Sequence, residues 1–401
     1  MGAAEAGPAG AAETESAGAA EAGPAGAGEV EVSADALLSA ARFEHRVGPC
    51  RVFSQRFEVW TTDAALAELL RELYTALLED PAALLEDPAA LLEGPAAPAP
   101  ADAVLAEGQG TGPETAPGAG QGAGPGAGPA TGPGQGRAGV GDVPPRFPGQ
   151  SAPDVTVYRL LPPSEPQRGV VARDDEVLVS SPRPATLLGR LVWAINRQVI
   201  DGTTDRLLLH AGAVEIDGVG VLLPADMEAG KTTLVTGLLD RGAGYLTDEA
   251  ASVTGRDRDL AVEGYAKPLS IDPGSWEVLA HHEPGLEPDL ADYFASQWQV
   301  SAARVGRVVR RAPLGVVVFR RFEAGTPTRL ERLGPAAAVQ RAVTCTFVTD
   351  TDHLPVVRLR ELAAMVERVP VYELVGGDLD AACDEVLGLV AELNASDDPT
   401  A

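Results

Sequence analysis

Apolar residues recur with strand and helix periods in two stretches, 36–80 and 154–205, separated by a long low-complexity segment. In the first, alternation around Val52–Trp60 predicts a strand. Five leucines spaced for one helix face then follow a polar cap at Thr62 or Asp63. In the second, two runs, 154–161 and 169–181, are each expected to form one strand, and a helix with apolar residues at helical spacing follows them. Together the two stretches predict one small α+β domain on the N-terminal side.

The pattern is sharper over residues 206–394. An apolar strand at 207–216 leads into Asp217–Gly218, a dipeptide typical of hairpin turns, and a second strand follows at Val219–Pro224. A helix and a short strand come next, and further elements are expected towards the C-terminus. These later elements are helix Lys231–Asp240, strand Tyr245–Thr247, strand Leu314–Phe322, helix Pro335–Val343 and helix Leu379–Glu392. Strands alternating with helices predict an α/β domain.

Two segments, 1–35 and 81–153, have too few large apolar residues to form a core. The chain has 45 glycines and 33 prolines, and half of them lie in these two segments, which make up little more than a quarter of its length. A seven-residue repeat, LLEDPAA, LLEDPAA, LLEGPAA, spans Leu77–Ala97, but a proline in every repeat excludes a coiled coil. Such sequences bury too little surface to offset their ordering entropy. We therefore expect both segments to be disordered, the second as an insertion in the small domain.

The charge and cysteine content narrow the class of protein. The chain has 58 acidic and 31 basic residues, a net charge of -27, and both its halves are acidic. This argues against binding to nucleic acid or to an anionic membrane, where excess Lys and Arg supply the affinity. The three cysteines have neither disulfide-framework nor zinc spacing, and no signal peptide or membrane span is visible. We expect a soluble, cytoplasmic protein.

The chemistry of the 206–394 region centres on the string VLLPADMEAGKTTLVTGLL, a buried strand followed by a loop and a helix. Gly230 lets the backbone pass close to a phosphate, and amides from Glu228 to Thr232 point inward at a helix N-terminus, where the dipole favours an anion. Lys231 supplies a positive charge for the β- and γ-phosphates, and the Thr232 hydroxyl can ligate magnesium. The context predicts an ATP-binding phosphate loop at Pro224–Thr233.

Two residues depart from the phosphate-loop pattern, and the lysine content of the chain supports it. Ala225 stands at the first glycine of the pattern G-x-x-x-x-G-K-[ST], and Glu228 adds negative charge to a loop meant for anions. Against this, the chain has only two lysines, Lys231 and Lys267, beside 29 arginines. A lysine kept in a chain that otherwise uses arginine indicates a site that needs a compact ammonium. This favours a phosphate loop over an ordinary helix start that contains GKTT.

Asp248 and Glu249 follow strand Tyr245–Thr247 directly. We expect this strand to be a parallel neighbour of the strand before the loop, which would place both acids at the carboxyl edge of the sheet. A carboxylate there binds the magnesium shell, as in a Walker B motif, and could also accept the proton of a hydroxyl acceptor. The alternative is a pair of surface carboxylates after a strand.

Histidines and the second lysine supply further candidates. His210 lies on the strand LLLHAG before the loop, where a lone histidine is usually structural. Lys267 precedes Pro268, which favours an extended backbone, so its side chain could reach a transferred phosphate or lie on the surface. The pair His281–His282 has no third ligand at metal spacing, so no metal site is predicted there.

The run LLLHAGAVEIDGVGVLLPADMEAGKTTLVTGLLDRGAGYLTDE resembles the catalytic core of the HPr kinase/phosphorylase family. The order of parts agrees: a histidine-bearing strand, a short turn, a loop strand, GK[ST], a helix ending near RG, and a strand closing on two acids. The later AKPLS string is similar to that of diverged HPr-kinase-like proteins. The resemblance implies a P-loop α/β core with a mixed sheet of the phosphoenolpyruvate-carboxykinase-like kind.

The resemblance also implies roles for individual residues. Asp248 matches the family's first acid, a metal-linked and base-like residue, and Glu249 takes the place of an aspartate. His210 matches a histidine near the reacting phosphate, and Thr232 with Asp248 would hold magnesium. The residues expected to bind the nucleotide are Glu228, Ala229, Gly230, Lys231, Thr232, Thr233 and Lys267.

The sequence leaves three functions open. The first is an ATP- and magnesium-dependent kinase acting on a hydroxyl, such as Ser or Thr of a peptide or protein, with Asp248, His210 and Glu249 as catalytic residues. The second is a nucleotide-binding accessory or regulatory protein that no longer transfers phosphate, which the departures at Ala225 and Glu228 favour. The third is a small-molecule kinase.

Overall fold

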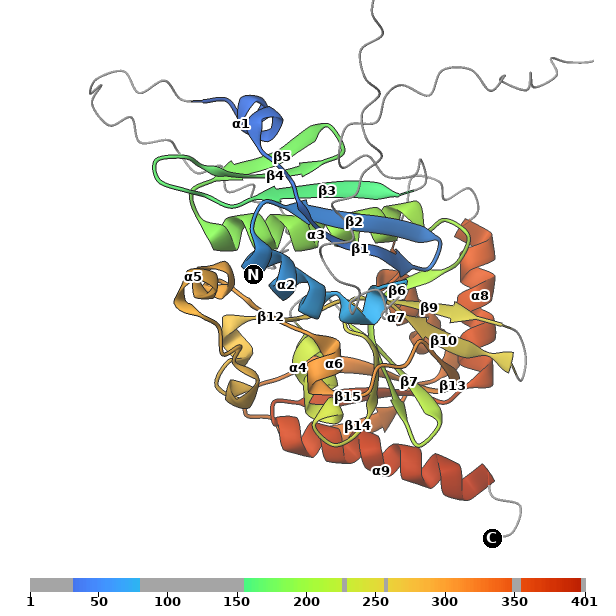
Figure 1. Ribbon diagram of the computed structural model, residues 1–401. Coiled ribbons are helices and arrows are strands. Elements are labelled where there is room, and N and C mark those ends of the chain that lie inside the picture. Colours follow the sequence, from blue (N-terminus) through green and yellow to red (C-terminus); the bar gives the residue numbers. More distant parts are fainter. Residues whose placement is uncertain (1–31, 80–154, 226–228, 256–258, 348–354, 398–401) are drawn as a thin grey trace, which may run out of the picture.

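The computed structural model describes residues 32–79, 155–225, 229–255, 259–347 and 355–397 (Figure 1). The 81–153 insertion and most of the 1–35 segment, both predicted to be disordered, lie outside the described residues, as does Glu228 of the loop. At the edge of the first segment, helix α1 (Ala34–Ala40) starts after Ser33, whose side chain caps it.

The N-terminal part of the chain forms a five-stranded sheet, at the top of Figure 1, in the order β1-β2-β3-β4-β5. Strand β2 pairs in parallel with β3, although more than 90 residues separate them in sequence. The region expected to form a single strand at 169–181 is two strands, because Asp174 takes a positive φ of 49° and turns the chain. The strands are β1 (His45–Val52), β2 (Gln55–Thr61), β3 (Thr156–Leu161), β4 (Gly169–Arg173) and β5 (Glu176–Ser181).

Both predicted helices of this part are confirmed. Helix α2 (Ala64–Leu73) starts at Asp63, whose carboxylate accepts a hydrogen bond from the Leu66 amide and so satisfies one free donor of the first turn. Its leucines are buried as the spacing predicts. Helix α3 (Pro184–Gly202) has proline in its first turn, where no amide donor is lost, and lies along the sheet.

The second part of the chain is built on an eight-stranded mixed sheet in the order β10-β9-β6-β7-β13-β15-β14, with β8 also paired to β6. Strand β10 pairs with both β9 and β13. Strands β7, β13 and β15 run parallel, so their carboxyl ends lie at one edge. The strands are β6 (Leu208–Ile216), β7 (Val219–Pro224), β8 (Gly244–Thr247), β9 (Ala250–Thr254), β10 (Ala261–Gly264), β13 (Arg311–Phe322), β14 (Arg329–Arg332) and β15 (Val371–Gly376).

The predicted hairpin between the first two of these strands is confirmed, and it corrects one expectation. Asp217 and Gly218 have positive φ values of 48° and 85°, as a tight two-residue turn requires, and β6 returns as antiparallel β7. Strand β8 pairs with β6, not with β7. The expected adjacency of β7 and β8 is therefore wrong: β8 runs parallel to β7, but the hairpin places β6 between them.

Helices cover both faces of the sheet, and β13 shows why. Its Val316 and Val318 belong to the buried cluster that includes helices α4 (Lys231–Leu239) and α9 (Leu379–Asp397). The alternate residues Val317 and Phe319 belong to the cluster that includes helices α7 (Pro335–Thr344) and α8 (Pro355–Arg368). A strand apolar on both faces is typical of a sheet between two helical layers.

Shorter elements connect β10 to β13. A two-stranded sheet pairs β11 with β12, and its register joins Leu269 to Val300. These elements are β11 (Leu269–Ile271), η5 (Pro273–Ser275), η6 (Ala280–His282), α5 (Pro288–Ala291), η7 (Asp292–Phe294), β12 (Trp298–Val300) and α6 (Ala302–Val305). A further short helix, η1 (Thr75–Leu77), follows α2.

The two sheets share one buried cluster. It runs from Phe57 and Leu70 of the small sheet and α2, through Leu187 of α3, to Leu234 and Leu238 of α4. The division of the chain into a small domain and a domain over 206–394 stays a prediction, because this apolar core is continuous across the proposed boundary.

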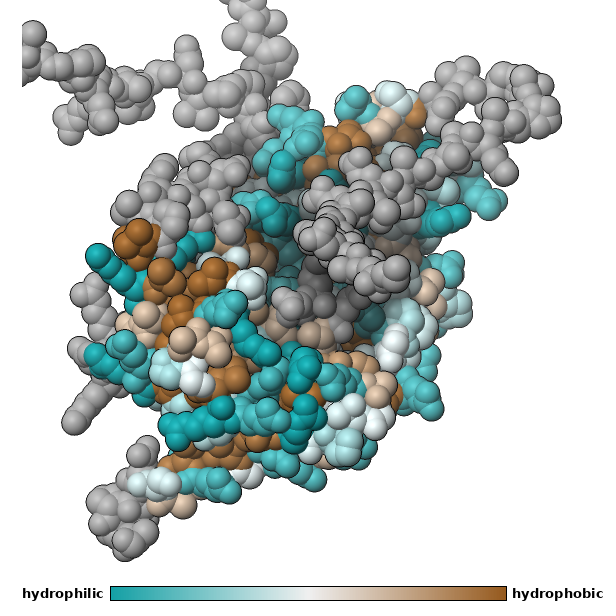
Figure 2. Space-filling model, turned by 180° about the vertical axis from the view of Figure 1, so that it is seen from behind, coloured by the Kyte–Doolittle hydropathy of each residue, from teal (hydrophilic) through white to brown (hydrophobic). Residues whose placement is uncertain are grey.

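Some large apolar side chains of the described residues are exposed. Most of the far side in Figure 2 mixes polar and apolar residues, and exposed valines and a leucine gather on α7 and α8. These are Val343, Val356, Val357 and Leu359. None of the described helices combines the length and the apolar run needed to cross a bilayer.

Candidate functional site

The loop between β7 and α4 begins at Ala225 and is described again from Ala229. Gly230 precedes the helix with φ 78° and ψ 25°, a left-handed conformation that costs glycine little and other residues more. The described non-glycine residues with positive φ are Phe53, Asp174 and Asp217, so Ala225 has an ordinary φ. An alanine is therefore sterically acceptable in place of the first glycine of the motif.

Lys231 starts α4 and turns its side chain back across the loop. The residue is only 7% exposed, and its Nζ donates a hydrogen bond of 2.9 Å to the carbonyl oxygen of Ala225. The ammonium thus lies between the two ends of the loop, at the positive end of the helix dipole. A buried cation at a helix N-terminus is an arrangement that attracts an anion.

Asp248 lies directly after β8 and faces the start of α4. The residue is 3% exposed, and its Oδ2 accepts a hydrogen bond of 2.9 Å from the Thr232 hydroxyl. Its Oδ1 accepts a second bond of 2.9 Å from the Tyr245 hydroxyl. The alternative of two surface carboxylates is therefore wrong for Asp248, which is buried and held in place by donors from two elements.

Lys267 neutralises this carboxylate. Its Nζ lies 2.9 Å from Asp248 Oδ1, and the lysine is 1% exposed, so the surface alternative is wrong for this residue too. The ammonium also donates to the carbonyl of Pro268 at 3.0 Å and to Ser270 Oγ at 3.3 Å. Both lysines of the chain are thus buried in one place, which accounts for their retention in an arginine-rich sequence.

Tyr245 is a member of the site that the sequence did not indicate. Burial, followed by the charge of Asp248, holds the pKa of its phenol well above the ordinary value. The hydroxyl is therefore neutral and serves as a hydrogen-bond donor to the carboxylate. Nothing in the sequence marks it, since a tyrosine at the start of a short strand is usually a packing residue.

His210 and Glu249 form a second pair beside Asp248. His210 Nε2 lies 3.9 Å from Glu249 Oε1, and the Ala211 amide donates to the Glu249 carbonyl at 3.2 Å. Glu249 keeps 29% of its side chain exposed, whereas Asp248 keeps 1%. Burial, only partly offset by the charge of Lys267, raises the pKa of the Glu249 carboxyl.

The raised pKa of Glu249 has a consequence for stability against pH. The folded protein keeps a proton on this carboxyl at pH values where the unfolded chain has lost it, so this group's contribution to stability falls as pH rises from the unfolded pKa through the folded one. Each pKa unit is worth about 1.4 kcal/mol. Glu249→Gln should therefore gain free energy of unfolding relative to wild type as pH rises through that window.

Urea unfolding of both proteins across the acidic to neutral range measures this gain. Glu165→Gln, at an exposed turn residue of the small sheet, is the matched control and should follow wild type at every pH. A constant difference between Glu249→Gln and wild type across the range would contradict the assignment.

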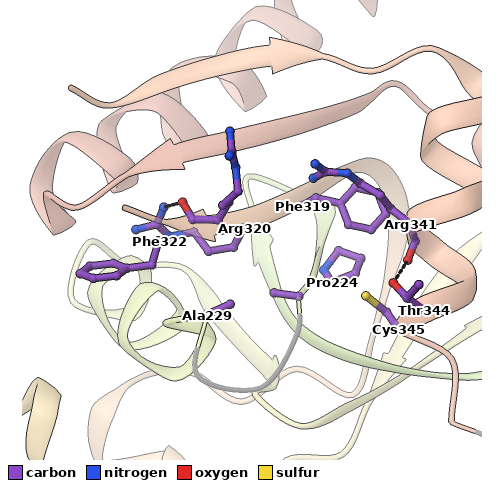
Figure 3. Close-up of a pocket in the computed structure, with 10 residues that line it drawn as sticks. Pro224, Ala229, Phe319, Arg320, Phe322, Arg341, Thr344 and Cys345 are labelled. Atoms are coloured by element: carbon purple, nitrogen blue, oxygen red, sulfur yellow. Dashed lines mark hydrogen bonds between the residues drawn. The ribbon is translucent and has the colours of Figure 1, made fainter. Parts of the chain in front are cut away.

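A cavity of about 380 Å³ opens beside the loop, at the carboxyl ends of β7 and β13 (Figure 3). Pro224 and Ala229 line it on the loop side, and Phe319 and Arg341 lie across from them. Cys345 closes one end, and its carbonyl accepts a hydrogen bond of 2.6 Å from the His210 amide. Through Cys345, the cavity adjoins the strand segment that carries His210.

Arginines give this cavity a positive wall. Arg320 is 7% exposed and donates to the Leu374, Gly376 and Arg321 carbonyls; burial lowers the pKa of its guanidinium. Arg341 pairs with Glu373, which Arg321 also contacts. Two of the three guanidinium groups, those of Arg321 and Arg341, share the single buried carboxylate of Glu373, so the cavity favours an anionic occupant.

The predicted site residues are thus largely brought together. Thr233, one position further along α4, bonds through its hydroxyl to Ser275 Oγ in the connecting segment, at 2.6 Å. The statement that His281–His282 lacks a third ligand is wrong in three dimensions, because the Asp240 carboxylate lies within 2.9 Å of both rings. Spacing along the chain could not reveal Asp240, which is about 40 residues upstream.

Comparisons with known proteins give matches among solved structures alone. No family model matches the chain, and no curated protein matches it. Among solved structures, the HPr(Ser) kinase/phosphatase from Coxiella burnetii matches with 14% sequence identity and a TM-score of 0.26. The match covers 47% of this chain and 98% of that chain. It falls in the family that the sequence resembles, but a likeness at this level leaves function to be argued from the residues of the site.

Proposed function

We propose that this protein is a kinase that transfers the γ-phosphoryl group of ATP to a hydroxyl group, on Ser or Thr of a peptide or protein. The observation that carries the proposal is the Thr232–Asp248 hydrogen bond, which joins the start of α4 to an acid after β8 beside two buried lysines. The loop before α4 would act as a phosphate loop, with Lys231 and the helix amides on the triphosphate.

The oxygen donors at this point fit a magnesium ion. The Thr232 hydroxyl and the Asp248 carboxylate lie 2.9 Å apart, and hydroxyl and carboxylate oxygens are the ligands that Mg²⁺ prefers. When bound with ATP, magnesium neutralises charge on the β- and γ-phosphates. Tyr245 and Lys267 hold the Asp248 carboxylate in one orientation, so that its Oδ2 stays directed at Thr232.

Asp248 and Glu249 would then have different roles in the transfer. Asp248 is buried and accepts hydrogen bonds on both oxygens, so it suits metal binding and positioning. Glu249 is more exposed, lies beside His210, and has a raised pKa, which makes its carboxylate a better proton acceptor than a free glutamate. We assign the acceptor's proton to Glu249, with His210 next to it.

The arginine-lined cavity suits the acceptor. It lies beside the loop, and Cys345 at its edge is hydrogen-bonded to the backbone of His210, so we place the acceptor chain there. Its guanidinium groups favour an acceptor that carries negative charge near the hydroxyl. A peptide with acidic residues flanking its serine is therefore the first substrate to try.

One observation favours a second function. The Lys267 ammonium lies 2.9 Å from Asp248, and a carboxylate neutralised in this way attracts a metal less strongly. The protein would then bind ATP and regulate a partner without transferring phosphate. Association with ATP in the absence of phosphate transfer to any acceptor would select this function over the kinase.

Lys231→Ala tests ATP binding at the loop, which both proposed functions require. Loss of the buried ammonium should weaken Mg-ATP binding and lower phosphate transfer by about 100-fold or more, because a preorganised charge on the phosphates is removed. Calorimetric titration with Mg-ATP and transfer of labelled γ-phosphate measure the two effects. Arg241→Ala, in the turn just beyond the far end of this helix, is the control. Equal Mg-ATP binding and equal, nonzero phosphate transfer in wild type, Lys231→Ala and Arg241→Ala would contradict the assignment of a phosphate loop.

A further inference from the structure

Three metal-ligating side chains meet at the far end of α4 from the loop. Asp240 is the residue that ends this helix, and His281 and His282 belong to η6. Nε2 of His281 lies 2.9 Å from one Asp240 oxygen, and Nε2 of His282 lies 2.7 Å from the other. The ligand atoms of all three residues lie within 4.8 Å of one another.

The convergence of the two rings is unusual for adjacent residues. Successive side chains in a 3₁₀ turn point roughly 120° apart. Here the ring centroids are 4.1 Å apart, and both Nε2 atoms are directed at the same carboxylate. Each ring can keep its proton on Nδ1 and offer the Nε2 lone pair. Two imidazole nitrogens and one carboxylate oxygen are a ligand set that zinc and related metals use.

The surrounding charges favour a cation at this point. The carbonyl end of α4 carries the negative end of the helix dipole. The neighbouring Arg241 does not compete for Asp240, because its guanidinium bonds to the Gly237 carbonyl and to Asp380. Two protonated rings in such contact would repel each other, and a single carboxylate balances only one of them. A divalent ion would satisfy all three side chains at once.

We propose that Asp240, His281 and His282 bind a divalent transition-metal ion of the zinc class. The side chains of His281 and Asp240 are 58% and 26% exposed, so an ion can enter from solvent and a water molecule can complete the coordination. The two histidines set this site apart from the all-oxygen site at Thr232 and Asp248, because magnesium disfavours imidazole ligands.

The metal would fix a segment that reaches the candidate functional site. Residues 267–282 follow α4 from end to end: Lys267 pairs with Asp248, Ser275 bonds to Thr233, and His281 with His282 reach Asp240. An ion at the last of these contacts would hold the segment against the helix. It would thereby stabilise the position of Lys267.

Zinc titration of the full chain tests the proposal. Calorimetry at neutral pH should show one zinc ion bound per chain, and Asp240→Asn and His282→Gln should each weaken it by about 10-fold or more. His45→Gln, on β1 of the small sheet, should leave it unchanged. The three cysteines are buried and do not offer a competing exposed thiolate site. A hundredfold excess of Mg²⁺ should not displace the zinc.

A second readout covers variants that fold poorly. Cobalt added to wild-type protein should give the visible absorption of a low-symmetry tetrahedral site, and zinc should raise the melting temperature of wild type but not of Asp240→Asn. Absence of one-to-one binding by the wild type, or binding that survives in both Asp240→Asn and His282→Gln, would overturn the proposal. The cluster would then be a hydrogen-bonded clamp without metal.

Discussion

Asp248→Asn should transfer phosphate from ATP about a thousandfold more slowly than wild type. The amide carries no charge for magnesium, and its NH₂ group would face the Thr232 or Tyr245 hydroxyl where an acceptor is needed. Charged groups placed at a phosphoryl-transfer site contribute about 10²- to 10³-fold each, and the lost metal contact adds to this. Transfer of labelled phosphate at saturating Mg-ATP measures the rate.

Glu249→Gln separates the roles of the two acids. It should lower the transfer rate by about 100-fold, the usual contribution of a general base, while leaving the affinity for Mg-ATP close to wild type. Asp248→Asn should weaken Mg-ATP binding as well. If Asp248→Asn transfers phosphate within a few-fold of wild type while Glu249→Gln does not, then Asp248 has no metal-binding role.

Lys267→Met should lower the free energy of unfolding by about 3–5 kcal/mol. Methionine fills a similar volume, but Asp248 would be left buried without its counter-ion, and an unpaired buried charge is costly. Urea unfolding followed by circular dichroism measures the loss. This prediction depends only on the buried pair and holds whether or not the protein is a kinase.

The double variant Lys267→Met/Asp248→Asn is the sharper measurement. Removing both charges should recover much of the stability lost in Lys267→Met, because the unpaired carboxylate is gone. Arg304→Met, an exposed cation in α6, should stay within about 0.5 kcal/mol of wild type. A Lys267→Met loss below 1 kcal/mol, or a double variant as unstable as the sum of its parts, would show that the pair is not coupled as described.

Local chemistry explains why much of the fold followed from the sequence. The Asp217–Gly218 turn, the Asp63 cap and the glycine before Lys231 each need a residue type suited to an uncommon backbone conformation or a free donor. Such requirements act within a few residues, so they can be recognised in the sequence. The helices at Pro184 and Pro335 follow for the same reason.

Features that depend on distant pairing were not predictable in this way. The strand at Tyr245–Thr247 was predicted with the wrong neighbour, because hydrogen-bond partners depend on the whole sheet. The Lys267–Asp248 pair and the approach of Asp240 to His282 join residues about 20 and 40 positions apart through connecting segments with no periodic pattern. A count of lysines pointed to the first pair, but no comparable feature pointed to the second.

The continuous buried cluster has a consequence for inherited variation in this protein. Phe57 lies far from the loop in sequence, yet it is packed in the same apolar network as Leu234 of α4. A substitution that hollows the small sheet would remove support from the helix that carries Lys231. Its effect would be a smaller fraction of correctly assembled molecules, each with unaltered chemistry, so damage at a remote position would look like low abundance.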